Sequence, residues 1–185
     1  MKKESIKSHL KPYSILQKRE TTINHAFASA VAPNDMYDEN IVSEAIKYLG
    51  QDPNRDLFCV YCGKKAETWD HVHSLVKDMN FSGYGHVIGN LLPCCKQCNS
   101  EKGSKTWVDY LNGKRISKTV KNKRKARIKA YIDRYLPRGI DYNVLKSKYT
   151  SDINEYESIK SKIFLLMKRA DKLASSIRMK LINSK

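Results

Sequence analysis

Two pairs of closely spaced cysteines enclose the residues of this sequence that are best suited to chemistry. Each pair has C-x2-C spacing, with Cys59 and Cys62 in the first pair and Cys95 and Cys98 in the second. Such pairs point two sulfurs at one centre, and Zn²⁺ prefers a closed tetrahedral set of thiolates in structural sites. The sequence therefore predicts a structural Zn²⁺ bound by these four cysteines. Cys94 breaks the spacing, and we interpret it as a small core residue.

Four polar residues of the kinds used in metal-dependent hydrolysis lie between or beside these pairs. Asp70 and His71 are adjacent, Asn90 precedes the second pair, and Asn99 directly follows it. Phosphodiester hydrolysis needs an activated water, which a neutral imidazole can supply, and a cation that neutralises charge. One carboxylate with one amide oxygen is a common way to hold Mg²⁺. Single residues of these types are usually turn or cap residues, but closing the zinc site would bring them together, which favours chemistry.

The ordered set of these residues resembles the HNH endonuclease family, within the ββα-metal nucleases, in its zinc-stapled version. The resemblance covers residues 57–112, about a third of the chain. It implies that Asp70 binds a catalytic metal, Mg²⁺ or another divalent cation, and that His71 is the general base. It also implies that Asn90 fixes the loop and thereby the His71 ring, that Asn99 completes the metal site, and that the four cysteines hold structural zinc.

Two further histidines leave alternatives open. His73 follows His71 by two positions, so a regular strand would put both on one face and Asp70 on the other. We expect a bend or bulge there, with His73 either a second active-site or phosphate-contacting residue or an ordinary packed or exposed strand residue. His86 lies in a glycine-rich loop at residues 81–86, where it either contacts DNA or makes a hydrogen bond that fixes the loop.

Composition indicates a nucleic-acid partner. The chain has 35 Lys and Arg against 19 Asp and Glu, a formal charge of +16, which favours binding to phosphate backbones by counterion release. We expect double-stranded DNA as the partner. Ribosomal and membrane-surface proteins share such a composition. No apolar run is long enough for a membrane span or a signal peptide, so we expect no membrane association. The thiols then belong in a reducing compartment, and we expect a cytoplasmic protein.

Apolar spacing and capping residues outline the elements around the site. They predict a helix over residues 38–49, strands over 68–75 and 87–92, a helix that starts near 93–96 and ends near Gly103, and a short helix over 106–112.

From these elements we predict an α+β fold with a zinc-stapled ββα-metal core at residues 51–113. An N-terminal helical segment, residues 1–50, precedes this core, and a basic, helical region, residues 114–185, follows it. A run of basic residues is usually a solvated face, but here it continues into apolar helical spacing, so we expect a basic helix that contacts the DNA backbone. The candidate cations are Lys102, Lys105, Lys121, Lys123, Arg124, Lys125 and Arg127.

The last third of the chain carries apolar residues at three- and four-residue steps over about thirty positions. This length suggests helix pairing, either with the same chain or with a second copy in a homodimer. Two copies would bring two active sites to one duplex. The row consists of Ile153, Tyr156, Ile163, Leu166, Ala170, Leu173, Ile177 and Leu181.

The function that these observations favour is a metal-dependent DNA endonuclease, site-specific and of restriction or mobile-element type. The alternative from another class is a non-catalytic zinc-ribbon protein whose basic helix binds nucleic acid. A nuclease acting on RNA or on a branched junction is a third interpretation. The presence of both a candidate base, His71, and candidate metal ligands argues against the binding protein.

Overall fold

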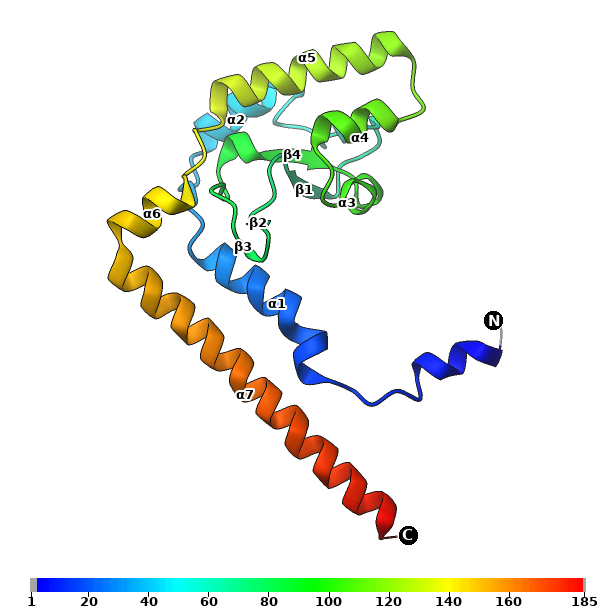
Figure 1. Cartoon of the computed structure of the whole chain (residues 1–185). Helices are drawn as coiled ribbons and strands as arrows, with labels where there is room; N and C mark the ends of the chain where they lie inside the picture. The colour runs from blue at the N-terminus through cyan, green and yellow to red at the C-terminus, as the bar shows by residue number, and fades with distance from the viewer. Residues whose placement is uncertain (1–2, 185) are drawn as a thin grey trace. The chain divides into compact units, whose positions relative to one another are not determined.

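The computed structural model describes residues 3–184, and this part of the chain forms two compact units (Figure 1). One unit is Ala28–Tyr142, and the other joins the residues up to Phe27 with those from Asn143 onward. The three consecutive segments predicted from the sequence, residues 1–50, 51–113 and 114–185, remain a prediction. In the described residues, the first unit holds two small antiparallel sheets and several helices, so the predicted α+β class is confirmed.

The candidate site is built on a two-stranded sheet followed by a helix. β1 (Thr68–His71) pairs antiparallel with β4 (Leu91–Cys94), so that Thr68 lies opposite Cys94 and His71 opposite Leu91. α3 (Lys96–Lys102) begins after β4, with Cys95 as its N-cap and Gly103 as its C-cap. The predicted helix is confirmed. The predicted strand ranges, 68–75 and 87–92, are wrong in extent, because β1 ends at His71 and its partner starts at Leu91.

The segment between the two strands explains why β1 ends early. Oδ1 of Asn90 accepts the backbone N–H of His73 at 2.8 Å, and Nδ2 of Asn90 donates to the His73 carbonyl at 3.0 Å. A side chain therefore takes the place of a strand partner at His73. The residues before β4 form a single 3-10 turn, η2 (Ile88–Asn90), where a strand was expected.

A second hairpin joins β2 (Val76–Lys77) to β3 (Asn80–Phe81). Its turn residues, Asp78 and Met79, both have positive φ, 50° and 62°. A two-residue turn with positive φ at both positions is the type I′ geometry that matches strand twist. The usual Asn-Gly or Asp-Gly signal is missing from the sequence at this point, and the hairpin was therefore not predicted.

Three helices enclose the core of this unit: α2 (Glu39–Tyr48), α4 (Trp107–Gly113) and α5 (Lys118–Tyr135). The predicted helices at 38–49 and 106–112 are thus confirmed. Each helix starts with a side chain that accepts a hydrogen bond from a backbone N–H two or three residues later, which satisfies groups left unpaired at a helix start. These caps are Asp38, Thr106 and Ser117.

The core of the unit lies between these helices and the β1–β4 sheet. Leu92 of β4, Leu111 of α4 and Ile128 of α5 are all fully buried in it. The Tyr131 hydroxyl donates to the carbonyls of Leu91, at 3.0 Å, and Ile88. α5 is therefore fixed against the segment that leads into the site.

The other unit pairs the two ends of the chain. It contains η1 (Lys3–Ser8), most of α1 (Ile15–Ala30), nearly all of α6 (Tyr142–Lys148), and α7 (Thr150–Asn183). The carboxylate of Asp171 on α7 caps α1, because it accepts the backbone N–H groups of Ile15 at 2.7 Å and Leu16 at 3.1 Å. This cap joins residues more than 150 positions apart, which local sequence patterns do not reveal.

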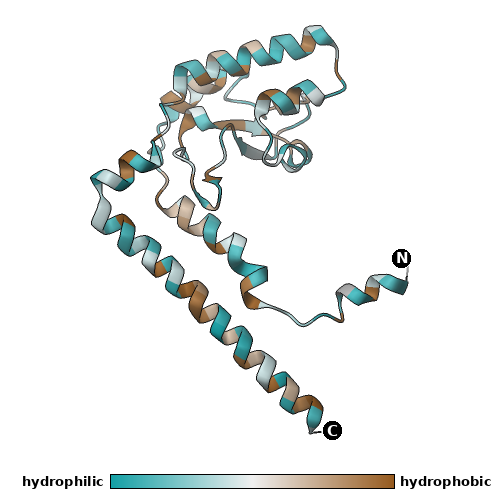
Figure 2. Ribbon diagram, in the orientation of Figure 1, coloured by the Kyte–Doolittle hydropathy of each residue, from teal (hydrophilic) through white to brown (hydrophobic). Residues whose placement is uncertain are grey.

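The apolar row predicted on α7 divides into two groups. Ile153, Tyr156, Ile163 and Ala170 are half-buried, whereas Leu166, Leu173, Ile177 and Leu181 are exposed. Figure 2 shows hydrophobic and hydrophilic residues mixed along the whole helix. Among the described residues, no helix combines the length and hydropathy needed to cross a membrane.

Candidate active site

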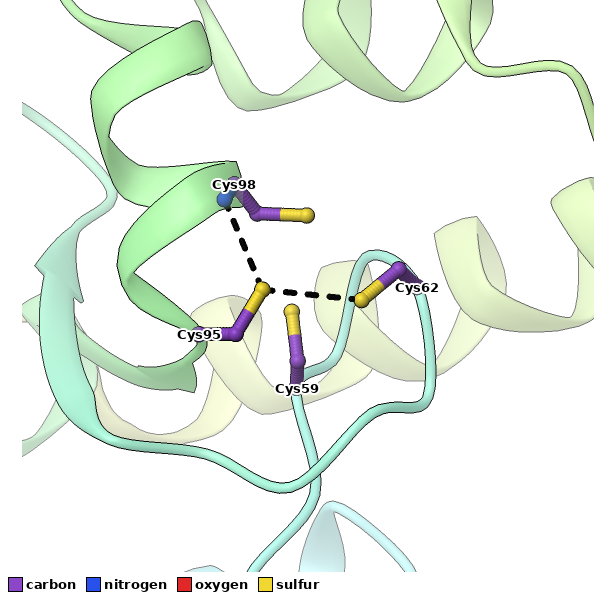
Figure 3. A group of neighbouring side chains, drawn as sticks. All are labelled: Cys59, Cys62, Cys95 and Cys98. Atoms are coloured by element: carbon purple, nitrogen blue, oxygen red, sulfur yellow. Dashed lines mark hydrogen bonds between the residues drawn. The ribbon is translucent and has the colours of Figure 1, made fainter.

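Four cysteine sulfurs gather between the start of α3 and the loop that precedes β1 (Figure 3). They belong to Cys59, Cys62, Cys95 and Cys98, and all four lie within 4.8 Å of one another. The sulfurs of Cys62 and Cys95 are 3.6 Å apart. Four thiolates at about 2.3 Å from a tetrahedral Zn²⁺ would be separated by about 3.8 Å, so the cluster fits this ion. The structure thus brings together all four predicted zinc ligands.

Cys94 lies next to this cluster. It is fully buried in the core, as expected for a small core residue. Its thiol also donates to the sulfur of Cys59, 3.9 Å away, which lowers the pKa of Cys59 to about 4. A lower thiol pKa favours the thiolate form that binds metal. The sequence analysis did not predict this contact.

Asp70 is buried, and both of its carboxylate oxygens have partners from this chain. Oδ2 accepts the hydroxyl of Tyr61 at 2.7 Å, and Oδ1 accepts the ammonium of Lys102 at 3.1 Å. The side chains of Asp70 and Lys102 are each 4% exposed. Because Tyr61 lies between Cys59 and Cys62, this network links the cysteine cluster to Asp70. No sequence pattern indicates this role of Tyr61, and Lys102 is an ion-pair partner in the core, where the sequence predicts a nucleic-acid contact.

His71, the next residue, presents a half-buried imidazole that meets a second imidazole. Its Nε2 lies 3.2 Å from Nδ1 of His86. Burial, and then the nearby His86, lower the pKa of His71. A lowered pKa keeps this ring neutral at neutral pH, and the neutral ring is the form that accepts a proton.

Asn90 is fully buried and fixes the loops that carry both histidines. Besides its two bonds to His73, its Nδ2 donates to the carbonyl of Gly85 at 2.9 Å. Its own carbonyl accepts the backbone N–H of Val72 at 2.9 Å. Asn90 therefore orients the loop after His71, which is the role that the family resemblance implied. The partner of the His71 ring itself is His86, not Asn90.

All of these residues fall within one match to a known family. The family model described as HNH endonuclease matches residues 59–105, about a quarter of the chain. Residues 59–105 form an HNH endonuclease domain. The match starts at Cys59 and runs past Asn99 and Lys102, so it spans the cysteine cluster, Asp70, His71 and Asn90. Comparison with curated proteins and with solved structures found no match.

His73 of the HNH domain serves packing in this structure. Its ring stacks on Tyr84, with centroids 4.1 Å apart and planes 14° apart. Burial lowers the pKa of His73. Because β1 ends before His73, the strand alternation that placed it on the same face as His71 does not apply.

The donor types at Asp70 and Asn99 fit a hard divalent cation, which prefers carboxylate and amide oxygens. Asn99 is half-buried on α3, in a shallow hollow that Glu67, Thr68 and Ser100 also line. Asp70 lies outside this lining and is neutralised by Lys102. A cation can therefore use the Asp70 carboxylate only if the ammonium of Lys102 moves away.

Replacing Lys102 with methionine should strongly destabilise the unit that holds the HNH domain. The carboxylate of Asp70 would stay buried without its counter-charge, and removal of one partner of a buried ion pair costs about 3–5 kcal/mol. Urea unfolding of the zinc-loaded protein measures the change. Lys105→Met is the matched control, because Lys105 is exposed, and should change stability by less than about 0.5 kcal/mol. A loss below about 1 kcal/mol for Lys102→Met would contradict the buried pair.

The basic residues expected to contact DNA differ in their surroundings. Arg124 donates to the carbonyl of Tyr61 in the first cysteine pair, and Lys121 donates to the carbonyl of Asn112 at 2.6 Å. Lys121 therefore joins α5 to α4, and Arg124 joins α5 to the loop between Cys59 and Cys62. Lys102 is buried, so we leave it out of the candidate DNA-contact surface. The remaining candidates are exposed or half-buried: Lys105, Lys123, Lys125 and Arg127.

Proposed function

We propose that this protein is a metal-dependent endonuclease that hydrolyses DNA phosphodiester bonds, with residues 51–113 as its catalytic core. One observation carries the proposal. Within an HNH domain, His71 offers a half-exposed imidazole with a lowered pKa, on a loop that the buried Asn90 fixes. A zinc ribbon that only binds nucleic acid has no need for such a base.

In the proposed reaction, His71 accepts a proton from a water molecule, and the water oxygen attacks the phosphorus of the scissile phosphate. The bond from phosphorus to the leaving oxygen breaks, and that oxygen takes up a proton from solvent water. Once the ammonium of Lys102 leaves the Asp70 carboxylate, Asp70 and Asn99 would hold a divalent cation such as Mg²⁺, which would neutralise charge on the phosphate and on the leaving oxygen. Zinc on the four cysteines would fasten the loop before β1 to α3.

We propose double-stranded DNA as the substrate and cutting at specific sites, as in enzymes of restriction or mobile-element type. The test uses plasmid, duplex DNA, RNA and a four-way junction of matched sequence, each with several divalent metals, followed by mapping of the cut ends. Discrete fragments from duplex DNA are expected. Cleavage of RNA or of the junction alone would replace the substrate, and binding without cutting would favour the zinc-ribbon protein.

Neutralising Lys123, Lys125 and Arg127 together, with glutamine, should weaken binding to all duplex sequences alike. These cations lie on α5 and are exposed or half-buried. Each phosphate contact that is lost should reduce the dependence of log affinity on log salt by about 0.9. Binding measured at several salt concentrations, on a cleaved and an uncleaved duplex, determines this slope.

The matched control for this variant neutralises three exposed lysines of α7, Lys162, Lys172 and Lys180. The control should keep the salt slope of the wild type. An unchanged slope in the α5 variant would mean that its basic face is only solvated. The DNA-binding groove would then lie elsewhere, with Lys105 and residues 82–86 as the next candidates.

We also propose that the exposed apolar residues of α7 pair with a second copy of the chain. Leu166, Leu173 and Ile177 are 63%, 58% and 58% exposed, and their spacing puts them on one face of the helix. A dimer would bring two nuclease sites to one duplex. Sedimentation velocity at increasing protein concentration tests this dimerisation.

Because metal-binding thiolates persist in reducing surroundings, we propose a cytoplasmic location.

A further inference from the structure

Two imidazoles share one hydrogen bond at the candidate base. Nε2 of His71 and Nδ1 of His86 are 3.2 Å apart, and the ring planes meet at 67° with centroids 5.1 Å apart. In a pair of neutral imidazoles, one of these nitrogens must carry the proton and the other must accept it. The direction of this hydrogen bond decides which nitrogen of His71 keeps a free lone pair.

The backbone holds the two histidines in this position from several sides. His71 lies at the end of β1, and its carbonyl accepts the ammonium of Lys102 at 2.9 Å. The N–H of His86 donates to the carbonyl of Pro33 at 2.8 Å, and the carbonyl of His86 accepts the N–H of Asp35 at 3.2 Å. The backbone on both sides of the ring contact is thus anchored by the fold.

The residue before His86 also has to be glycine. A Cβ at Gly85 would lie 1.9 Å from the carbonyl oxygen of Pro33, and the Gly85 carbonyl is held by the side chain of Asn90. The loop that carries His86 therefore packs closely against residues 33–35. Asn90 anchors both this loop and the loop after His71, so the two backbone segments that carry the rings are held close together.

We propose that His86 is a positioning residue for His71: Nδ1 of His86 accepts Nε2–H of His71 and leaves Nδ1 of His71 free to take the proton from water. This rests on the proposed function, with His71 as the base. The opposite direction would block it, because His71 would then carry its proton on Nδ1 and have its Nε2 lone pair occupied.

His86→Ala should lower kcat for cleavage by about 10²-fold with little change in KM, since small misplacements of a reacting group cost about this much. His86→Asn should restore most of the rate, because an asparagine oxygen can stand near the former Nδ1 and accept the same hydrogen bond. His86→Gln reaches the Nε2 position instead and should restore less. His25→Ala, an exposed histidine of α1, is the control and should keep the wild-type rate.

A second readout does not depend on activity. Nitrogen-15 NMR of the histidine rings should find the Nε2–H tautomer of His71 in the wild type and a mixture in His86→Ala. The proposal is overturned if wild-type His71 carries its proton on Nδ1, if His86→Ala keeps its kcat, or if it changes only KM, as a DNA contact would. If the wild type cuts no nucleic acid, the proposed function fails, and the tautomer still decides whether His86 sets the protonation of His71.

Discussion

Cys98→Ser is expected to abolish zinc binding and to unfold the Ala28–Tyr142 unit. Its sulfur lies within 4.8 Å of the other three cysteine sulfurs, and three of the four residues are buried. Apparent zinc binding to structural sites is worth about 10–16 kcal/mol, as much as or more than the about 5–15 kcal/mol by which whole domains are stable. The same result is expected for Cys59, Cys62 and Cys95. Metal analysis and circular dichroism of each variant measure it.

Cys94→Ser is the matched control for this series, because it changes a cysteine of the same core without removing a predicted ligand. It should keep zinc, since a serine hydroxyl can still donate to the sulfur of Cys59. A stability loss of about 1 kcal/mol is expected from the altered packing. If Cys94→Ser lost zinc while Cys95→Ser kept it, the ligand assignment would have to be exchanged.

His71→Ala should reduce DNA cleavage by at least about 10²–10⁴-fold, the usual contribution of a general base. Zinc content and DNA affinity should stay near those of the wild type. The ring of His71 contacts His86 and does not touch the cysteine sulfurs. Single-turnover cleavage with excess enzyme separates the chemical step from binding.

Asn99→Ala provides the contrast to His71→Ala. It should raise the concentration of divalent metal needed for half-maximal cleavage and leave the rate at saturating metal closer to the wild type. Asp70 is less suited to this comparison, because its carboxylate also holds Tyr61 and Lys102. A His71→Ala protein that keeps substantial activity over a range of pH would show that another group is the base.

The parts of the site that were predictable are those fixed by short-range spacing. C-x2-C pairs impose the cysteine cluster, and the cap and glycine around α3 set its ends at Cys95 and Gly103. The buried side chain of Asn90 bonds to His73 on the loop after His71, and the family resemblance implied that Asn90 fixes this loop. The cysteine cluster and the ends of α3 depend on residues a few positions apart and on a metal site whose chemistry is specific, whereas the role of Asn90 came from the resemblance.

The parts that were not predictable depend on contacts between distant residues. Lys102 looks like a surface cation in the sequence, but the turn of α3 brings its ammonium to the buried carboxylate of Asp70, 32 positions away. His86 was placed in a loop, yet its contact with His71 depends on how Pro33 fixes that loop. The strand lengths were misjudged because the side chain of Asn90 replaces a backbone partner at His73.

Incubation of the zinc-loaded protein with supercoiled plasmid, with and without added divalent cation, tests whether this protein is a metal-dependent endonuclease with His71 as its base. Nicked or linear DNA is expected with Mg²⁺ or another divalent cation, and intact plasmid is expected when His71→Ala replaces the wild type under the same conditions. The proposed function fails if the wild type binds the plasmid but leaves it supercoiled with every divalent cation tried. Equal cutting by the wild type and His71→Ala would contradict the role of His71 as the base.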